Sequence, residues 1–397
     1  MSRQAEAPAT GVNDQVEQGI LAFIDEFVAL RRDLHTHPEL AFEEVRTAGI
    51  VAQLLASWGY EVTTGVGGTG VVGTLKRGDG ARSIAIRADM DALPIHEATG
   101  LPYASETPGV MHACGHDGHT TILLAAARYL AESGRFSGTL NLVFQPAEEL
   151  GRGARRMLND GLFERFPSDA VFGLHNWPGE PEGQFGFVDG PAMASIDYAR
   201  ITVTGKGGHG AAPHLAVDPV VASAAIVLAL QSVVARSINP LDTAVVTVGS
   251  IHGGQAANVI PESVELTLTA RAYDKGVRDR IKERITALAE AQAASFGATA
   301  AVEYRNGFPP VINHAAETHF ARSVAVDAFG PARVAETFTP RTASEDFAYL
   351  LQARPGSYLF IGNGDSAPLH SPNYNFNDAL LAPAAVYWAR LAQAYLS

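Results

Sequence analysis

The chain has 397 residues, of which 47% are hydrophobic, so it holds enough apolar mass for a full core and is too long for one average domain. Its net charge of -13 and its lack of any Lys- or Arg-rich run argue against a nucleic-acid partner, which needs a basic surface. The longest apolar stretch, residues 220–230, is shorter than the about 20 residues that cross a bilayer, so we expect no membrane segment.

The first part of the chain alternates between helical and strand patterns. Residues 1–14 are polar, and we predict that they form a disordered tail. Apolar residues at helical spacing predict helices around 20–30 and 48–55, on either side of Pro38. Strand-like runs follow at 70–75, 83–87, 139–144 and 170–174, with helical patterns at 120–132 and 154–160. This alternation predicts an α/β fold, in which helices flank a mixed, mostly parallel sheet.

From about Ser195 the pattern changes to an alternation of buried and exposed positions. Strands are predicted at 199–203, 244–251, 264–270 and 299–305, and helices at 219–237 and 277–295. The order β-α-β-β-α-β is typical of a ferredoxin-like α+β sandwich. The α/β pattern then resumes, with helices at 315–329, 344–352 and 381–396 and a strand at 357–362. We therefore predict a discontinuous domain, 15–194 and 312–397, interrupted by an inserted domain, 195–311.

Polar side chains follow three of the predicted strands. Asp89 and Asp91 come after one strand, Glu148 and Glu149 after another, and His175 after a third. Because ligands bind outside the carboxyl ends of the strands in open α/β sheets, we expect these side chains to share one site.

The chemistry of this predicted site is that of a metal hydrolase. Cys114 and His116 are separated by one residue, and a thiolate with an imidazole favours zinc or another borderline first-row ion. Adjacent glutamates at a strand end point to opposite sides, so one can bind metal while the other moves a proton. A lone cysteine is more often a small buried hydrophobe, and a glutamate pair more often a solvated surface. The joint occurrence favours the metal site.

Over nearly its whole length the chain resembles the di-metal aminoacylase and carboxypeptidase family. Within that family it is most similar to hippurate hydrolases, N-acyl amino acid amidohydrolases and plant auxin-conjugate hydrolases. The resemblance rests on the stretches DLHTHPE (33–39), RADMDALP (87–94), MHACGHDGH (111–119), QPAEE (145–149), GKGGHGA (205–211) and NVIP (258–261).

The resemblance implies two divalent metal ions per subunit, with the thiolate of Cys114 shared between them. The implied ligands are Cys114, His116, Glu149, His175 and His370. Zinc, manganese, cobalt and nickel all suit this set, and the sequence leaves open which ligand serves which ion. The wider family has a metal-binding histidine where this chain has Asp89. We therefore expect His116 to replace it, with Asp89 and Asp91 outside the ligand set and Asp91 orienting an imidazole.

The resemblance also assigns roles in catalysis and binding. Glu148 is expected to be the general base, taking a proton from water and delivering it to the leaving amine. His209, in the inserted domain, is implied to reach across a dimer and polarise the scissile carbonyl. Arg271 and Asn258 are implied to hold the α-carboxylate of the amino acid, and strand alternation places Arg271 on an open sheet face. Residues 195–311 then form a lid and dimerisation domain of a homodimer or homotetramer.

The favoured function is hydrolysis of hippurate-like N-acyl amino acids, which are small molecules, to a carboxylic acid and a free amino acid. The alternatives are a metallo-carboxypeptidase or dipeptidase, and a non-enzymatic metal-containing binding or scaffold protein. The presence of Glu148, His209 and every implied ligand favours an enzyme. The chain lacks the Gly-x-Ser-x-Gly elbow of serine hydrolases and any phosphate loop. One cysteine and a start without a secretion signal lead us to expect a cytoplasmic protein.

Overall fold

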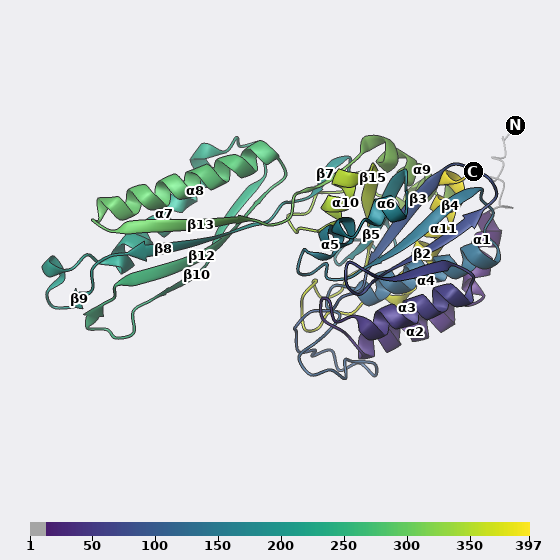
Figure 1. Ribbon diagram of the computed structural model, residues 1–397, viewed down its shortest axis with the longest axis horizontal. Coiled ribbons are helices and arrows are strands. Elements are labelled where there is room, and N and C mark those ends of the chain that lie inside the picture. Colours follow the sequence, from purple (N-terminus) through teal and green to yellow (C-terminus); the bar gives the residue numbers. More distant parts are fainter. Residues whose placement is uncertain (1–12) are drawn as a thin grey trace, which may run out of the picture. The chain divides into compact units, whose positions relative to one another are not determined.

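The computed structural model describes residues 13–397 and divides them into two units (Figure 1). The first unit runs to Gly190 and includes Ile312–Thr339 and Tyr349–Ser397, and the second comprises Pro191–Val311 and Pro340–Ala348. We expected residues 340–348 in the discontinuous domain. They join the second unit because Arg341 N donates to Ala192 O at 2.8 Å and Ala194 N donates to Arg341 O at 3.1 Å.

A mixed sheet forms the centre of the first unit, as the sequence predicted. Its strands, in the described part of the chain, are β1 (Glu61–Val66), β2 (Gly70–Arg77), β3 (Ser83–Asp89), β4 (Gly138–Gln145), β5 (Ala170–Trp177), β6 (Phe185–Gly186) and β15 (Gly356–Gly362). They lie in the order β1-β2-β4-β3-β5-β15-β6. The central strands β4, β3, β5 and β15 are parallel, whereas β1, β2 and β6 are antiparallel to their neighbours. The edge strand β1 was not predicted, because it is polar and mostly exposed and so has no alternation of buried apolar residues.

Helices flank this sheet. They are α1 (Asn13–Leu21), α2 (Ile24–Thr36), α3 (Val45–Ser57), α4 (His116–Glu132), α5 (Gly153–Asn159), α6 (Leu162–Arg165), α9 (Ala315–Phe329), α10 (Phe347–Ala353) and α11 (Leu381–Tyr395). The predicted helix around 20–30 is two helices, with a break between Leu21 and Ile24. Helix α1 includes positions 13 and 14 of the predicted tail, and residues 1–12 lie outside the described residues.

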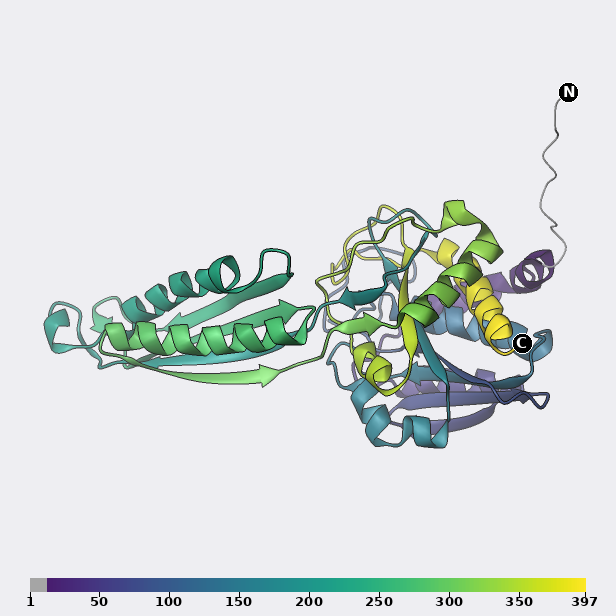
Figure 2. The same ribbon diagram turned by 90° about the horizontal axis from the view of Figure 1, so that it is seen from above.

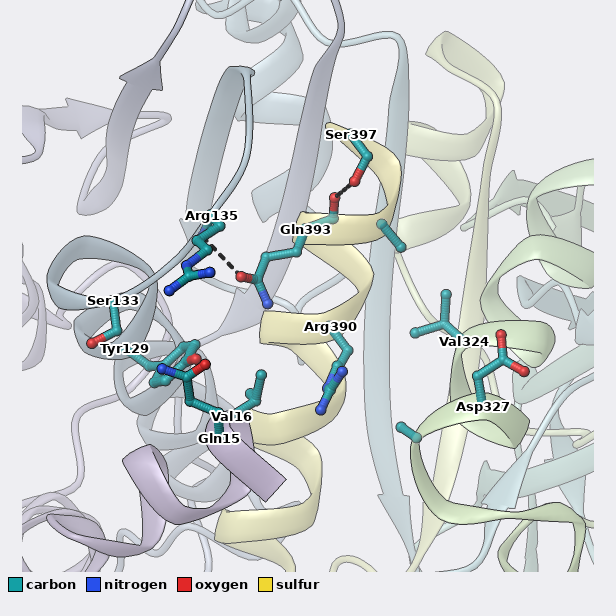
Figure 3. A pocket seen from close by; sticks show the side chains of 12 residues that line it. Gln15, Val16, Tyr129, Ser133, Arg135, Val324, Asp327, Arg390, Gln393 and Ser397 are labelled. Carbon is teal, nitrogen blue, oxygen red and sulfur yellow. Dashed lines mark hydrogen bonds between the residues drawn. The ribbon is translucent and has the colours of Figure 1, made fainter. Parts of the chain in front are cut away.

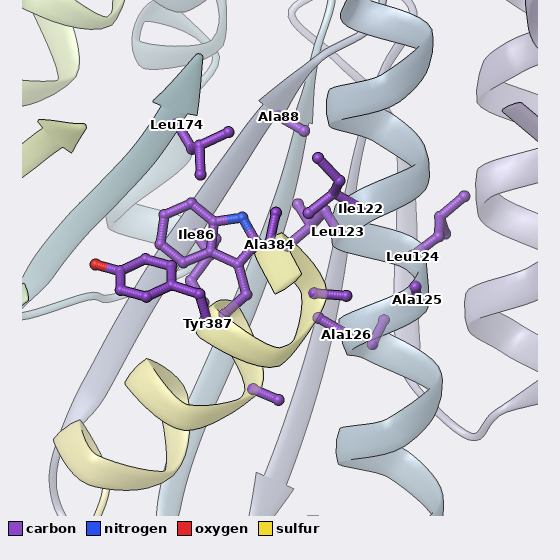
Figure 4. Close-up of a cluster of buried hydrophobic side chains, with 14 of the residues drawn as sticks. Ile86, Ala88, Ile122, Leu123, Leu124, Ala125, Ala126, Leu174, Ala384 and Tyr387 are labelled. Atoms are coloured by element: carbon purple, nitrogen blue, oxygen red, sulfur yellow. The ribbon is translucent and has the colours of Figure 1, made fainter. Parts of the chain in front are cut away.

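The main core lies between the sheet and the helices α4 and α11. Alternate side chains of β3, including Ile86 and Ala88, are buried there. Figure 4 shows Ile86, Leu174 and Tyr387 of α11 in this core together with side chains of α4. Helix α4 is buried along almost its whole length, including its first residue, His116. The packing of α4 therefore fixes where its polar N-terminus lies.

The second unit is the predicted ferredoxin-like sandwich. Its main elements are β8 (Asp197–Thr204), α7 (Pro219–Ser237), β10 (Ala244–Gly253), β12 (Ser263–Ala272), α8 (Lys275–Ser295) and β13 (Thr299–Asn306). The strands of this described unit lie in the order β10-β12-β8-β13, and all pairs are antiparallel. Figure 2 shows α7 and α8 side by side against the sheet. The remaining short elements are β7 (Gly190–Met193), β9 (Gly208–His209), η1 (Pro213–Leu215), β11 (Val259–Ile260), β14 (Val311–Asn313), η2 (Pro331–Arg333) and η3 (Asp378–Leu380).

The local sequence explains how the helices of the second unit begin and which sheet face they cover. Asp218 accepts the N–H of Val220 at 2.8 Å and caps α7, and Asp274 caps α8 in the same way. On β12 the predicted alternation holds, because Leu266 and its even-numbered neighbours are buried beneath the helices. The odd-numbered positions of β12 therefore lie on the open face.

Helix α7 is longer than the apolar stretch on which the expectation of no membrane segment was based. Within residues 13–397 it is the one helix that is long and apolar enough, by length and composition, to cross a membrane. We expected no such segment because the apolar stretch 220–230 is short, but the helix extends over 19 residues and its many alanines and valines keep its average hydropathy high. The finding is weak evidence for a membrane, since core helices of soluble proteins meet the same criterion. Ile226, Leu230 and Val233 of α7 are buried in the core of the second unit.

Candidate metal centre

Polar side chains from distant segments of the first unit meet at one edge of its sheet. They come from the loop after β4, the start of α4, the end of β5 and the loop after β15, and they are Glu148, Glu149, Cys114, His116, His175 and His370. Because β4, β5 and β15 are parallel, the loops at their carboxyl ends share this edge. The structure thus brings all five predicted ligands together with the predicted base.

Within the described residues, two groups of donor atoms share the sulfur of Cys114. The ligating atoms of Cys114, His116 and His175 all lie within 4.8 Å of one another. Those of Cys114, Glu149 and His370 meet the same limit. A thiolate between two such groups suits a pair of cations that are both bound by sulfur, nitrogen and oxygen donors.

Gly115 makes the close approach of these groups possible. It precedes α4 with φ 91°, a left-handed conformation that favours glycine. A Cβ atom there would lie 2.4 Å from Oδ1 of Asn176 and 2.6 Å from the hydroxyl of Tyr374. The glycine therefore lets Cys114 and His116, on either side of it, face the same space at the positive end of α4.

Hydrogen bonds fix the orientation of two imidazoles. The Nδ1 atom of His116 donates to the backbone carbonyl of Asp91 at 2.9 Å, and Nδ1 of His175 donates to that of Asn176 at 2.6 Å. In each ring the Nε2 lone pair is then left for another partner. The His175 Nε2 lies 3.4 Å from the Cys114 sulfur, and the buried His116 Nε2 has no hydrogen-bond partner among the described residues.

Asp91 also organises the glutamate pair. Its Oδ1 accepts the backbone N–H of Glu148 and its Oδ2 accepts that of Glu149, both at 3.0 Å. The Glu148 carboxylate is buried, and it lies within 4.8 Å of the ligating atoms of His116 and Glu149. Asp91, which we expected to orient an imidazole, contacts His116 Nδ1 through its backbone carbonyl at 2.9 Å and through its Oδ1 at 3.3 Å. The same side chain also holds the two glutamates.

Glu149 and His370 face each other across the second donor group. Glu149 Oε1 lies 3.3 Å from His370 Nε2 but makes no hydrogen bond to the described residues. Burial alone raises the pKa of Glu149, but His370 and His116 outweigh it and lower that pKa. His370 has φ 64°, and its backbone N–H donates to Ala113 O at 2.8 Å, so its strained backbone is held in place.

The electrostatics of the cluster favour bound cations. Burial, followed by the charge of Glu149, raises the pKa of the Cys114 thiol well above its usual value. Burial opposes the charge of His116, but Asp89 and Asp91 outweigh it and raise the pKa of this imidazole to about 10. Divalent cations shift both groups towards the thiolate and the neutral imidazole, which are the ligating forms. The buried atoms His116 Nε2 and Glu149 Oε1, which make no hydrogen bond to the described residues, fit such cations as well.

His119 was missed as a site residue by the sequence reasoning. Its Nδ1 lies 2.6 Å from Oδ1 of Asp89, and its Nε2 lies 2.8 Å from Oδ1 of Asn176. Its ring centroid is 4.6 Å from that of His175. Asp89 in turn accepts Nη1 of Arg87 at 2.6 Å. The available signal was helical spacing, because His119 follows His116 by three residues and so lies on the same face of α4.

A second buried network, around His35, was also missed. His35 Nδ1 lies 2.9 Å from Asp117 Oδ2, and its Nε2 lies 3.3 Å from Glu97 Oε1. Burial opposes the charge on this ring, but Asp117 and Glu97 outweigh it and raise the pKa of His35 to about 9. The histidine lies in the motif DLHTHPE and is fully buried. It ties α2 to the residue that follows His116.

The three other predicted site residues belong to the second unit. His209, on β9, pairs with Val259 of β11, and Gly210 N donates to the carbonyl of Asn258 at 2.8 Å. Asn258 and His209 therefore lie together. Arg271, on the open face of β12, is half-buried and donates through Nη1 to Ser344 Oγ at 2.8 Å.

A surface pocket of about 370 Å³ in the first unit lies away from the donor cluster (Figure 3). Tyr129 and Arg390 are among the residues that line it. Tyr129 lies 13 residues beyond His116 on α4, a helical distance of about 20 Å. The pocket is therefore at the far end of α4 and takes no part in the donor cluster.

The chain is similar in sequence to known proteins over most of its length. Residues 85–394 match the model of the peptidase family M20/M25/M40. A hippurate hydrolase of Campylobacter jejuni is 45% identical over 95% of this chain and 98% of its own length. An N-acetyl-L-cysteine deacetylase of Bacillus subtilis is 40% identical over 91% of this chain and 86% of its own.

A solved structure also matches. It is a Bacillus subtilis protein described as a dinuclear metal binding peptidase from the M20 family, with a TM-score of 0.82 and 35% identity. The match covers 95% of this chain and 99% of that one. Sequence and fold lead to the same assignment: the chain belongs to the peptidase family M20/M25/M40.

Proposed function

We propose that this protein is a metal-dependent amidohydrolase that cleaves N-acyl amino acids of the hippurate type to a carboxylic acid and a free amino acid. The observation that carries the proposal is the pair of donor groups sharing Cys114, with the Glu148 carboxylate beside them. The similarity to a hippurate hydrolase and to an N-acetyl-L-cysteine deacetylase supports this substrate class.

The residues divide between two ions. Cys114, His116 and His175 would hold one divalent ion, and Cys114, Glu149 and His370 would hold the other. Zinc, manganese, cobalt and nickel all suit this set. When bound, the ions supply a Lewis acid that polarises the scissile carbonyl and lowers the pKa of water. The relative described as a dinuclear metal binding peptidase supports two ions per subunit.

Glu148 is the general base and acid in this proposal. It takes a proton from the attacking water as the new C–O bond forms at the carbonyl carbon. It then delivers that proton to the amide nitrogen as the C–N bond breaks. Asp91 supports this task, because its hydrogen bonds to the backbone of Glu148 and Glu149 hold the two side chains in place.

His209 polarises the carbonyl oxygen as a hydrogen-bond donor. Ala211 N donates to Nδ1 of His209 at 3.0 Å, so the neutral ring carries its proton on Nε2. The side chain is exposed, so a substrate can reach this N–H. Asn258 and Arg271 hold the α-carboxylate of the amino acid, for which the planar guanidinium of Arg271 is suited.

The proposal includes a homodimer formed through the second unit. Helix α7 exposes Val220, Val221 and Leu228, the last of which is 75% exposed. An apolar stripe of this kind is typical of an interface. His209 of one subunit then completes the site of the partner. We further propose a cytoplasmic location, because the shared ligand Cys114 has to remain a reduced thiol.

The test is turnover by the metal-reconstituted protein of three substrate classes: hippurate, N-acetyl amino acids, and dipeptides with a free amine. We expect chelator-sensitive hydrolysis of the first two. Preference for dipeptides with a free amine would instead identify a dipeptidase or carboxypeptidase, the alternative suggested by the peptidase relative. Absence of turnover of every N-acyl amino acid by fully metal-loaded protein would refute the proposal.

A further inference from the structure

Glu44 is a buried carboxylate next to the loop that carries the two functional glutamates. It immediately precedes α3 and is fully buried. Its Oε1 accepts the backbone N–H of Ala147 at 2.9 Å. Its Oε2 accepts the hydroxyl of Thr69. A carboxylate from a different part of the chain is thus hydrogen-bonded to the residue directly before Glu148.

The backbone of Ala147 needs such support. Its φ is 53°, a left-handed conformation that is unfavourable for alanine and persists only when its surroundings impose it. On its other side, the Ala147 carbonyl accepts Gly153 N at 3.2 Å, at the start of α5. Glu44 and α5 therefore hold the two faces of this strained residue. A residue in this conformation turns the chain sharply, so its geometry decides where the next side chains point.

Three consecutive backbone N–H groups are held by two carboxylates. Glu44 accepts that of Ala147, and Asp91 accepts those of Glu148 and Glu149. The two carboxylates come from different elements, since Glu44 precedes α3 and Asp91 follows β3. The loop is consequently anchored to both the sheet and a helix that covers it.

We propose that Glu44 is a positioning residue for hydrolysis, which sets the placement of Glu148 and Glu149 through the backbone of Ala147. The inference rests on the proposed function for the roles of those two glutamates. What matters in this proposal is the length of the Glu44 side chain and its acceptor oxygen, since its partners are an N–H group and a hydroxyl. Its negative charge matters less.

A matched pair of variants distinguishes the effect of the length of the Glu44 side chain from the effect of its charge. Glu44→Gln keeps the length and an acceptor oxygen but removes the charge, whereas Glu44→Asp keeps the charge but is shorter by one methylene. The first readout is the affinity and visible absorption spectrum of bound Co²⁺, which report on ligand placement without any turnover. The second is the separation of kcat from KM for the best N-acyl amino acid.

We expect Glu44→Asp to weaken Co²⁺ binding and lower kcat by about 10- to 100-fold, the usual cost of losing a group that supports a ligand, with KM little changed. We expect Glu44→Gln to retain the spectrum, the affinity and most of kcat. The opposite order, or equal losses in both variants, would overturn the proposal. If Glu44→Asp does not fold, Thr69→Val takes its place, because it removes the other partner of Glu44. Weaker Co²⁺ binding then supports the proposal, and unchanged binding overturns it.

Glu39 provides the control at the same end of α3. It accepts the backbone N–H groups of Arg46 and Thr47, each at 2.8 Å, and so caps the helix without a side-chain hydrogen bond to the glutamate loop. Glu39→Asp is expected to leave Co²⁺ binding and its spectrum unchanged. A loss equal to that of Glu44→Asp would mean that any weakening of α3 has the same effect, and the proposal would fail.

The Co²⁺ readout also keeps this proposal separate from the proposed function. If the unmodified protein binds Co²⁺ tightly but hydrolyses no N-acyl amino acid, the function is refuted. The comparison of Glu44→Gln with Glu44→Asp then still decides whether Glu44 places the ligand Glu149.

Discussion

The sulfur of Cys114 lies 3.4 Å from Nε2 of His175, although the two residues are 61 positions apart in the chain. Cys114 lies two residues before the first residue of α4, and His175 lies near the carboxyl end of β5. The packing of α4 against the sheet therefore brings a thiol and an imidazole into contact in a buried place. Two more donor atoms, from Glu149 and His370, lie within 4.8 Å of the same sulfur.

Cys114→Ala is expected to remove the donor that both groups share. We expect the purified variant to contain less than one ion per subunit and to lose more than about 100-fold in activity. This loss exceeds the about 10- to 100-fold that is usual when a residue hydrogen-bonded to a metal ligand is removed. Metal analysis after dialysis measures the first quantity. Cys114→Ser, which keeps an oxygen donor, serves as the control and should retain more metal. Two tightly held ions in the alanine variant would show that the sulfur is not shared.

Glu148→Gln is expected to lower kcat by about 10²- to 10⁴-fold, the usual contribution of a general base, while metal content stays the same. The amide of Gln keeps the size of the side chain but cannot take a proton from water. Glu149→Gln is the matched comparison and is expected to lose metal. If the Glu148 variant loses the ions and the Glu149 variant keeps them, the two roles are reversed.

Arg271→Lys is expected to raise KM for N-acyl amino acids by about 10- to 100-fold, because a lysine cannot form the paired hydrogen bonds of a guanidinium to a carboxylate. Methyl esters of the same compounds should be poor substrates of the unmodified protein, and their KM should change little on substitution. Arg200, another arginine of the same sheet, is half-exposed and pairs loosely with Glu265, so Arg200→Lys is the control. Equal effects on the free acid and the ester would exclude a carboxylate clamp.

His35 is expected to make stability depend on pH. Its pKa rises from 6.5 to about 9 on folding, because Asp117 and Glu97 outweigh the effect of burial. Protonated His35 therefore contributes its full stabilisation of the folded state below pH 6.5. This contribution to the free energy of unfolding, up to about 3 kcal/mol, is lost as the pH rises through about 9. Urea unfolding of the unmodified protein and of His35→Gln, across this range, measures the change. A stability difference that stays constant between these pH values would contradict the assignment.

Leu228→Glu is expected to convert a dimer into a monomer, because it places a charge in the exposed apolar stripe of α7. Sedimentation velocity measures the mass. Since His209 of one subunit is proposed to serve the partner, activity should fall with the dimer. Leu241→Glu is the control, because Leu241 is 91% exposed but lies outside the helix. An unchanged mass for the Leu228 variant would exclude this face as the interface.

Periodicity was sufficient to predict much of the architecture. The alternation along β12, with Leu266 and Leu268 buried, and the order of elements in the second unit follow from patterns of burial that repeat every two or about 3.6 residues. Such patterns are local, so they are visible in one sequence. They failed where burial was not periodic, as in the exposed edge strand β1 and the break near Phe23 between α1 and α2.

The sequence by itself identified the candidate donors. Carboxylates and His175 follow predicted strands at the edge where ligands bind, Cys114 and His116 are separated by one residue, and the family resemblance added His370. Only the tertiary structure decided how these groups are held. Three contacts hold them: Asp91 binds the backbone of the glutamates, His119 pairs with Asp89, and Glu44 supports Ala147. Each joins segments that are 30 to 103 residues apart in the chain. No local pattern encodes such contacts, since they arise when strand order and helix packing bring distant loops to one edge of the sheet.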